Sequence, residues 1–395
     1  MRNFTFKGLL LTAVFMLLGC LSIQAANDDL ITKQITINLD KAGTLPNKIA
    51  SSEMYKITNL KIIGEINGTD WNMIREMAGR DNRGYGTEGK LSVLDLSEAK
   101  IVKGGDSYYP GDNCYTSNDE IGEKAFTDCS RLTSLTLPVG ITSIGYDAFA
   151  YCSGLTSLNL PAGITSINYG AFLDCSGLTS LTLPDGITSI GSRAFYGCSG
   201  LTSLTLPAGI TSIGDDTFYG CSGLTSLTLP AGITSIGEYA FSGCSGLTSL
   251  TLPAGITSID KYAFSGCSRL TSLTLPAGIT SIGEFAFSYC SGLTSIYVYA
   301  EKVPRIGRYA FEGCASRKCT LYVPKGTYDN YRLSEFGYFE NIVEFDATGI
   351  DKTTTSTDVE EVSRYSVNGQ RLAVPVKGLN IVKYSDGSAR KVVVK

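Results

Sequence analysis

The sequence predicts an α/β-type repeat solenoid of short parallel strands stacked coil upon coil, followed by a small all-β module. Three observations predict it. From residue 132 the chain repeats with a period of 23 residues. Nine Ala-Phe or Thr-Phe pairs, from Ala125-Phe126 to Ala310-Phe311, recur along the chain. Cysteines keep the same period at positions 129, 152, 175, 198, 221, 244, 267 and 290.

The first half of each unit predicts a strand and a turn. Three leucines spaced by three and then two residues, as at Leu155, Leu158 and Leu160, predict a short strand with one buried side. A proline and a glycine follow, as at Pro161 and Gly163. Because proline cannot donate to a ladder and glycine tolerates positive φ, the chain is expected to turn out of the sheet there.

The second half of each unit predicts the convex side of the coil. Ile164 and Ile167 point inward from a second short extended or irregular segment. Ala171-Phe172 and Cys175 are then expected to fill the convex side, from a single turn of helix. One unit cannot bury this apolar set alone, whereas stacked units bury it as a continuous core.

The pattern Leu-x-x-Leu-x-Leu-Pro-x-x-Ile-x-x-Ile-x-x-x-Ala-Phe-x-x-Cys closely resembles the BspA-like class of bacterial leucine-rich repeats, of Bacteroidota type, over residues 132–314. The resemblance implies a right-handed arc with short helical or irregular convex segments. Residues 64–79 resemble the capping region of this family. We expect Asp70 to be the N-cap of a short helix there, and weaker strands at 57–63 and 91–96.

The predicted organisation has six parts. They are a signal peptide over 1–25, an N-terminal cap with irregular repeats over 27–130, regular repeats over 131–319, a C-terminal cap over 320–346, a linker over 347–363 and a small β module over 364–395. The module is expected to contain strands at 365–372, 378–382 and 391–394. It is similar to the short C-terminal sorting domains of exported Bacteroidota proteins, which implies delivery to or retention at the surface.

The first residues predict export to the cell surface, the outer membrane or the medium. Arg2 and Lys7 supply positive charge before an apolar run over 9–18 that is too short to span a bilayer comfortably. Two processing routes remain open. Residues 17–20 resemble a lipobox with Cys20 as the lipidation site, and residues 23–25 resemble an ordinary signal-peptidase site. Membrane contact is expected only through such a lipid or through C-terminal anchoring.

Composition argues against several classes of function. The chain contains no histidine, which removes Ser-His-Asp and Cys-His catalysis and every imidazole metal site. With 33 basic and 37 acidic residues and no basic cluster, nucleic acid is not an expected partner. Adjacent Asp215-Asp216 are interpreted as solvated surface. We therefore expect no enzyme activity, no cofactor and no metal.

The cysteine column is expected to be a buried ladder of reduced thiols. Equivalent residues of neighbouring coils lie about 4.8 Å apart with parallel Cβ vectors, whereas a disulfide needs Cβ atoms near 3.8 Å and a twisted geometry. A bridge between Cys314 and Cys319, which lie outside the regular spacing, remains open.

The candidate binding site is an aromatic column at the variable position before Ala-Phe, formed by Tyr239, Tyr262, Phe285 and Tyr309. Stacking between coils would explain it, and so would a partner-binding hot spot. The neighbouring column alternates in charge through Glu238, Lys261, Glu284 and Arg308, which predicts ion pairs between coils. Threonine and serine columns on the strand face suit either weak binding or solubility.

These features predict adhesion or protein binding at the bacterial surface. Members of the resembling family are associated with attachment to host matrix or cells, which implies a host extracellular-matrix or cell-surface protein as partner, with a glycan as the other option. Two alternatives remain, a structural spacer of the envelope and a carbohydrate-binding surface module.

Overall fold

The computed structural model describes residues 29–109, 111, 113–347, 361–366, 371–372, 377–384 and 389–394. These residues belong to two compact units that divide after residue 345. The expected signal peptide, with Cys20, and most of the expected linker lie outside the described residues.

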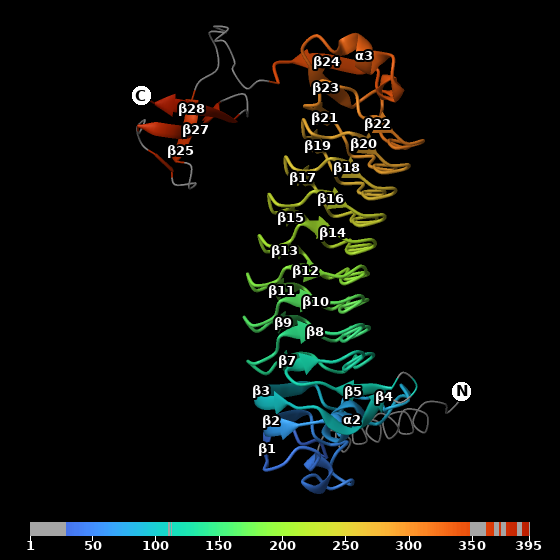
Figure 1. Cartoon of the computed structure of the whole chain (residues 1–395), viewed down its shortest axis with the longest axis vertical. Coiled ribbons are helices and arrows are strands. Elements are labelled where there is room, and N and C mark those ends of the chain that lie inside the picture. Colours follow the sequence, from blue (N-terminus) through green and yellow to red (C-terminus); the bar gives the residue numbers. More distant parts are fainter. Residues whose placement is uncertain are drawn as a thin grey trace, which may run out of the picture. The chain divides into compact units, whose positions relative to one another are not determined.

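The first unit begins with three parallel strands, an antiparallel pair of strands, a 3-10 helix and an α-helix (Figure 1). In chain order the elements are β1 (Ile35–Leu39), the 3-10 helix η1 (Leu45–Asn47), β2 (Asn59–Ile66), α2 (Gly68–Met77), β3 (Val93–Ile101), β4 (Gly104–Tyr109) and β5 (Cys114–Thr116). β2 and β3 correspond to the two weaker strands expected from the sequence. β1, which pairs in parallel with β2, was not expected.

Each repeat then contributes a strand of three to five residues to one face of the solenoid. These strands are β7 (Ser134–Thr136), β9 (Ser157–Asn159), β11 (Ser180–Thr182), β13 (Ser203–Thr205), β15 (Ser226–Thr228), β17 (Ser249–Thr251), β19 (Ser272–Leu275), β21 (Ser295–Val298) and β23 (Thr320–Pro324). Together with β1, β2, β3 and the final strand β24 (Asn341–Phe345), they form three parallel sheets, β1-β2-β3-β7-β9-β11, β13-β15 and β17-β19-β21-β23-β24. Equivalent residues pair, as Leu181 does with Leu158, so register follows the 23-residue period.

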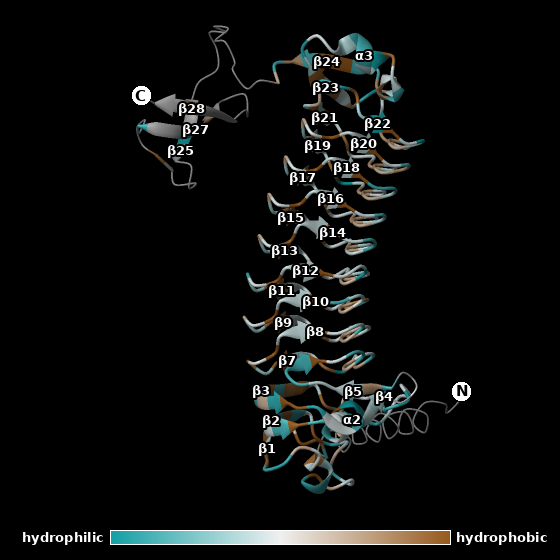
Figure 2. Ribbon diagram, in the orientation of Figure 1, coloured by the Kyte–Doolittle hydropathy of each residue, from teal (hydrophilic) through white to brown (hydrophobic). Residues whose placement is uncertain are grey.

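A second parallel ladder of two-residue strands runs beside the first. It consists of β6 (Glu120–Ile121), β8 (Ser143–Ile144), β10 (Ser166–Ile167), β12 (Ser189–Ile190), β14 (Ser212–Ile213), β16 (Ser235–Ile236), β18 (Ser258–Ile259), β20 (Ser281–Ile282) and β22 (Arg305–Ile306). The sheet orders are β12-β10-β8-β6 and β14-β16-β18-β20-β22. The predicted parallel-strand solenoid is confirmed, and its hydropathy pattern recurs from coil to coil (Figure 2).

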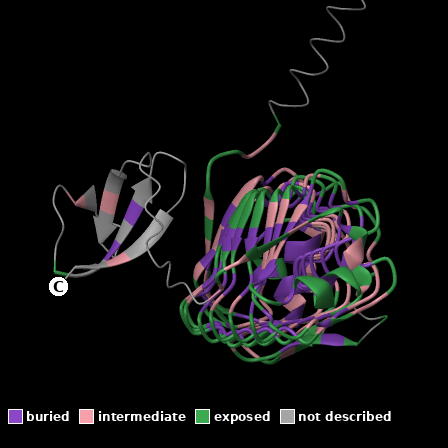
Figure 3. Ribbon diagram, turned by 90° about the horizontal axis from the view of Figure 1, so that it is seen from above, coloured by how far each residue is buried: buried purple, intermediate pink, exposed green. Residues whose placement is uncertain are grey.

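The core is a continuous apolar column inside the coils. Figure 3 shows the buried residues on the inside of the stacked coils. Its centre is a stack of nine phenylalanine rings with centroids 5.1–5.5 Å apart, which we call the phenylalanine spine: Phe126, Phe149, Phe172, Phe195, Phe218, Phe241, Phe264, Phe287 and Phe311. Trp71 of α2 covers its first ring at 5.2 Å, and Phe336 and Phe339 cover its last at 5.7 and 5.4 Å. Both caps therefore close the core with aromatic rings.

The convex segment is irregular, so the expected turn of helix is wrong. In each coil the residue before Ala-Phe has a left-handed φ, as at Asp147 (50°), and so does the residue four positions later, as at Tyr151 (61°). A right-handed helix cannot contain such residues. Instead the Phe149 N–H donates to the Ala171 carbonyl of the next coil at 2.8 Å. Alternate N–H groups of the segment thus bond to the next coil, and those between them bond to the carbonyl three residues earlier, as Ala150 does to Asp147 at 3.0 Å.

The helix of the N-terminal cap begins one turn earlier than expected. Asn67 is the N-cap of α2 and accepts a hydrogen bond from the Thr69 N–H at 3.1 Å, so the assignment of Asp70 as N-cap is wrong. Asp70 is the third helical residue and completes a capping box with the Asn67 N–H at 3.0 Å. Its buried carboxylate also accepts from the Gly43 and Leu45 N–H groups, which ties η1 to the helix.

The C-terminal end of the first unit contains α3 (Tyr328–Arg332), the 3-10 helix η3 (Glu335–Tyr338) and β24 (Asn341–Phe345). β24 pairs in parallel with β23 and extends the strand face by one strand. The buried Tyr331 hydroxyl donates to the Ala300 carbonyl at 2.5 Å. The aromatic-rich segment thus supplies both a final strand and a cover for the core.

The second unit is an antiparallel sheet in the order β26-β25-β27-β28. Its strands are β25 (Glu361–Ser366), β26 (Arg371–Leu372), β27 (Gly378–Tyr384) and β28 (Ala389–Val394). The single strand expected over 365–372 is wrong, because Tyr365 of β25 pairs with Arg371 of β26 in antiparallel register. The Asn368-Gly369 dipeptide between them is a strong sequence signal for a hairpin.

Candidate functional site

The aromatic ridge, Tyr239, Tyr262, Phe285 and Tyr309, lies on the irregular convex segments. All four residues have left-handed backbone angles, with φ between 55° and 59°. That conformation costs about 1–2 kcal/mol for a residue with a side chain, and glycine, asparagine or aspartate adopts it most readily. The other five coils place Lys124, Asp147, Gly170, Arg193 and Asp216 at this position. The ridge therefore holds large side chains where the backbone favours small ones.

The four rings stack on one another from coil to coil. Ring centroids are 4.6 Å apart between Tyr239 and Tyr262, 4.8 Å between Tyr262 and Phe285, and 5.1 Å between Phe285 and Tyr309. The first two pairs are parallel within 9°. Most ring faces are covered by neighbouring rings, so the stack presents mainly ring edges and tyrosine hydroxyls to a partner. Tyr309, the last ring, is 59% exposed.

The structure extends this ridge by two residues that the sequence pattern did not single out. Tyr219 meets Tyr239 edge-on at 6.3 Å and stacks on Tyr196 at 4.7 Å. Both follow the core phenylalanine of their coil directly, whereas the ridge residues precede Ala-Phe. Because the two positions are three residues apart in the repeat, an alignment that compares one repeat position at a time does not reveal their contact. Their contact arises from the curled convex segment.

The neighbouring charged column does not form the expected ladder. In residues 113–347, none of Glu238, Lys261, Glu284 and Arg308 takes part in an ion pair, while Arg193 pairs with Asp216 at 3.1 Å elsewhere on the convex side. An exposed pair contributes only about 0–1 kcal/mol, which is too little to order two long side chains. Backbone hydrogen bonds such as Tyr239 N–H to the Lys261 carbonyl, at 3.0 Å, join these coils instead.

The threonine column of the strand face is engaged with the scaffold. Thr179 Oγ1 donates to the Thr156 carbonyl of the preceding coil at 3.0 Å, and the same bond recurs at Thr225, Thr271 and Thr294. These hydroxyls satisfy carbonyl groups along the array. The strand face is thus a uniform surface on which the threonine before each strand, as at Thr179, already donates its hydroxyl hydrogen bond to the preceding coil.

The cysteine column also serves the scaffold, in a way that the sequence did not reveal. From Cys152 to Cys314, each Sγ–H donates to the carbonyl of a core phenylalanine in the previous coil, at 3.0–3.4 Å. The thiols are buried and free. Burial raises the pKa of Cys129 to about 11 and that of Cys221 to about 12. At neutral pH these groups are therefore protonated and poorly nucleophilic.

This burial predicts alkaline destabilisation. For Cys221 the pKa is 9.0 in the unfolded chain and about 12 in the fold. Its contribution to stability is fully present below pH 9 and is lost as pH rises toward 12, because the unfolded chain releases the proton first. At pH 10.5 the loss amounts to about 2 kcal/mol for this thiol. Urea unfolding of the wild type and of Cys221→Ala at pH 8.0 and 10.5 measures this loss of unfolding free energy. Equal pH dependence in the two proteins would contradict the assignment.

The structure gives Cys314 and Cys319 as two buried free thiols, without the bridge that the sequence left open. Among the described residues, no three cysteine, aspartate or glutamate side chains are grouped to hold a metal ion. Within the same part of the chain, no helix is long and apolar enough to cross a bilayer.

Fold and surface together define a solenoid of 23-residue leucine-rich coils, with a fixed core and a convex side whose residues differ between coils. The chain belongs to the BspA-type leucine-rich repeat family. Residues 114–225 and 211–331 match that family in six copies, which covers more than half of the chain. The resemblance seen in the sequence is thereby confirmed.

Several solved structures are similar to this chain. A leucine-rich repeat protein from Bacteroides ovatus is 28% identical, with 59% of this chain and 66% of that chain covered and a TM-score of 0.46. A T. pallidum leucine-rich repeat protein is 33% identical, with 39% and 72% covered and a TM-score of 0.38. A leucine-rich cell surface protein from Faecalibacterium prausnitzii is 22% identical, with 67% and 82% covered and a TM-score of 0.29. No curated protein matches the sequence.

Proposed function

We propose that this chain is an exported surface protein that binds protein partners and attaches the cell to host matrix or host cells. Its membership of the BspA-type leucine-rich repeat family and the apolar run over 9–18 support export and surface display. The proposal assigns no enzyme activity to a chain without histidine. It assigns binding to the convex side of the solenoid.

The observation that carries the proposal is the aromatic ridge on strained backbone. Four successive coils place a ring at a left-handed position where the other five coils have lysine, aspartate, glycine, arginine and aspartate in turn. Stacking offsets part of the strain, by about 0.5–1.5 kcal/mol for each pair. Lys124 and Arg193 show that a coil tolerates a long side chain on this backbone, but a spacer would not need four successive aromatic rings there. Tyrosine-rich surfaces supply large contact area at low entropy cost, as protein interfaces require.

The geometry of the stack favours a protein over a glycan. Sugars pack against the open faces of aromatic rings, and Tyr262 has both ring faces covered, by Tyr239 and by Phe285. Ring edges and hydroxyl groups remain outward, together with Lys261 and Glu284 beside them, which form no ion pair within the described part of the chain. Such a mixed edge suits the apolar centre and polar rim of a protein interface.

Replacing all four ridge residues by asparagine is expected to weaken attachment to immobilised host extracellular matrix by roughly 2–4 kcal/mol, because clustered hot-spot rings are lost. Asparagine is chosen because it accepts the left-handed backbone. Loss of stacking and relief of strain then offset each other, and we expect the melting temperature to stay within a few degrees. Surface plasmon resonance on matrix protein and thermal unfolding measure the two effects.

The matched control changes the opposite surface. Thr205→Lys with Thr251→Lys places two cations on the strand face, at exposed threonines whose hydroxyls donate no hydrogen bond within the described part of the chain. We expect normal attachment. If this variant loses attachment while the asparagine variant keeps it, binding belongs to the strand face and the proposed site is wrong.

A further inference from the structure

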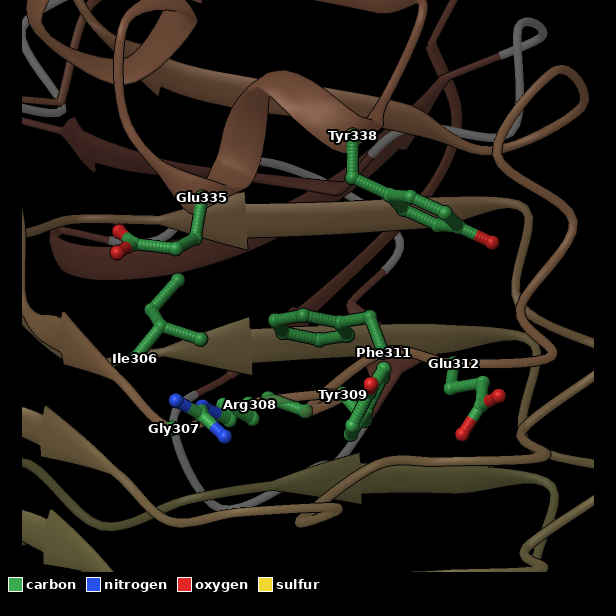
Figure 4. A pocket seen from close by; sticks show the side chains of 9 residues that line it. Ile306, Gly307, Arg308, Tyr309, Phe311, Glu312, Glu335 and Tyr338 are labelled. Atoms are coloured by element: carbon green, nitrogen blue, oxygen red, sulfur yellow. The ribbon is translucent and has the colours of Figure 1, made fainter.

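The ring stack of the ridge ends at a pocket beside the C-terminal cap (Figure 4). The pocket has a volume of about 350 Å³. The last coil contributes Ile306, Tyr309, Phe311 and Glu312, and η3 contributes Glu335 and Tyr338. Because η3 replaces the next regular coil, the pocket occupies the place where the convex surface of another repeat would continue.

Tyr309 is the last ring at the C-terminal end of the ridge, so one of its two faces is not covered by another ridge residue. One face packs on Phe285 at 5.1 Å, and among the described residues no second ring contacts Tyr309. Tyr338 lines the same pocket, and its hydroxyl donates to the Cys314 carbonyl at 2.9 Å, which holds its ring in place. The pocket is therefore a slot beside two aromatic rings, suited to a planar group that extends the stack.

The charges of the slot favour a cation. Glu312 and Glu335 lie on opposite sides of the pocket, and both are exposed (Figure 4). Neither belongs to an ion pair in the described part of the chain. The lining carries these two carboxylates against the single guanidinium of Arg308, which leaves one negative charge in excess. The floor, formed by Ile306 and Phe311, is apolar. A planar cation on a hydrocarbon stem matches all of these features.

We propose that this pocket holds the guanidinium group of an arginine side chain presented by a protein partner. Guanidinium is planar, stacks on tyrosine faces and forms paired hydrogen bonds with a carboxylate. Lysine lacks the planar group, and a neutral sugar would leave the excess charge unmatched. This inference rests on the proposed protein-binding function and names the residue type that the end of the ridge would recognise.

Titration of the full chain with the peptide acetyl-Gly-Gly-Arg-Gly-Gly-amide, followed by saturation-transfer NMR, tests the proposal. The same peptide with citrulline in place of arginine keeps the planar shape and removes the charge. We expect the citrulline peptide to bind at least about tenfold more weakly than the arginine peptide. A third peptide, with lysine in place of arginine, is expected to bind at least about threefold more weakly than the arginine peptide. Equal binding of the arginine and citrulline peptides would overturn the proposal.

Variants locate the binding. Glu312→Gln and Tyr338→Leu are each expected to weaken binding of the arginine peptide by about fivefold or more. Glu53→Gln, at an exposed site in the N-terminal cap, is the control and is expected to leave the affinity unchanged. Unchanged affinity in both pocket variants, with unchanged melting temperature, would place the peptide elsewhere. Saturation transfer to methyl α-glucoside or methyl β-galactoside without transfer to the peptide would make the slot a sugar site.

The two proposals fail separately. Both pocket variants keep the ridge residues Tyr239, Tyr262, Phe285 and Tyr309. If peptide selectivity is absent while the four-asparagine variant still loses matrix attachment, only the arginine inference is wrong. If the peptide binds selectively and the ridge variant attaches normally, the slot is real and the proposed function of the ridge is wrong.

Discussion

Deletion of one complete coil, residues 201–223, is expected to leave a folded solenoid that is one coil shorter. Every contact of the deleted coil has an equivalent across the new junction. β15 would pair with β11 in the serine-to-serine register seen elsewhere, Phe241 would stack on Phe195, and Cys244 would donate to the Phe195 carbonyl that Cys221 now uses. Because coils contact mainly their neighbours, the array loses one coil and one interface.

Deletion of half of that coil, residues 201–211, is expected to abolish the cooperative fold. It removes β13 but keeps β14 and the convex segment, so the remaining residues cannot close a coil or keep register with both neighbours. Size-exclusion chromatography, far-ultraviolet circular dichroism and urea unfolding compare the two proteins. A sharp unfolding transition in both, or in neither, would contradict a solenoid whose stability depends on whole coils.

Replacing one phenylalanine of the spine by alanine is expected to lower the free energy of unfolding by about 3–5 kcal/mol, the range typical of buried phenylalanine in protein cores. Phe218 is fully buried and stacks on Phe195 at 5.3 Å and on Phe241 at 5.1 Å. Phe218→Ala opens a cavity between Phe195 and Phe241, which the backbone ladder holds two coil spacings apart, so the cavity cannot collapse easily. Both interfaces of the coil are weakened at once.

Tyr289→Gly is the control for this truncation. Tyr289 is 58% exposed at a left-handed position where several other coils have glycine, such as Gly243 and Gly266. We expect a change within about 0.5 kcal/mol, since exposed sites outside special contacts contribute little. Free energies come from urea unfolding of both variants. A loss below about 1 kcal/mol for Phe218→Ala would show that the spine does not hold the coils together.

The repeat determines most of the fold because its signals are local and recur. The leucine spacing places Leu158 opposite Leu181, and identical neighbours leave only one register that buries every apolar side chain. The stacked aromatic column could likewise be found by aligning the units. Its extension through Tyr219 and Tyr196 could not, since Tyr219 meets Tyr239 from a different repeat position through the path of the convex segment.

The sequence by itself determined the coil length, the strands, the buried residues and the variable columns, since each depends on spacing within one unit and on its repetition. Tertiary structure decided the rest. The convex segments are irregular because alternate N–H groups bond to the next coil, which no pattern within a coil expresses. The terminal pocket joins Tyr309 to Tyr338 across a cap with no repeat to align, so only the folded chain brings these residues together.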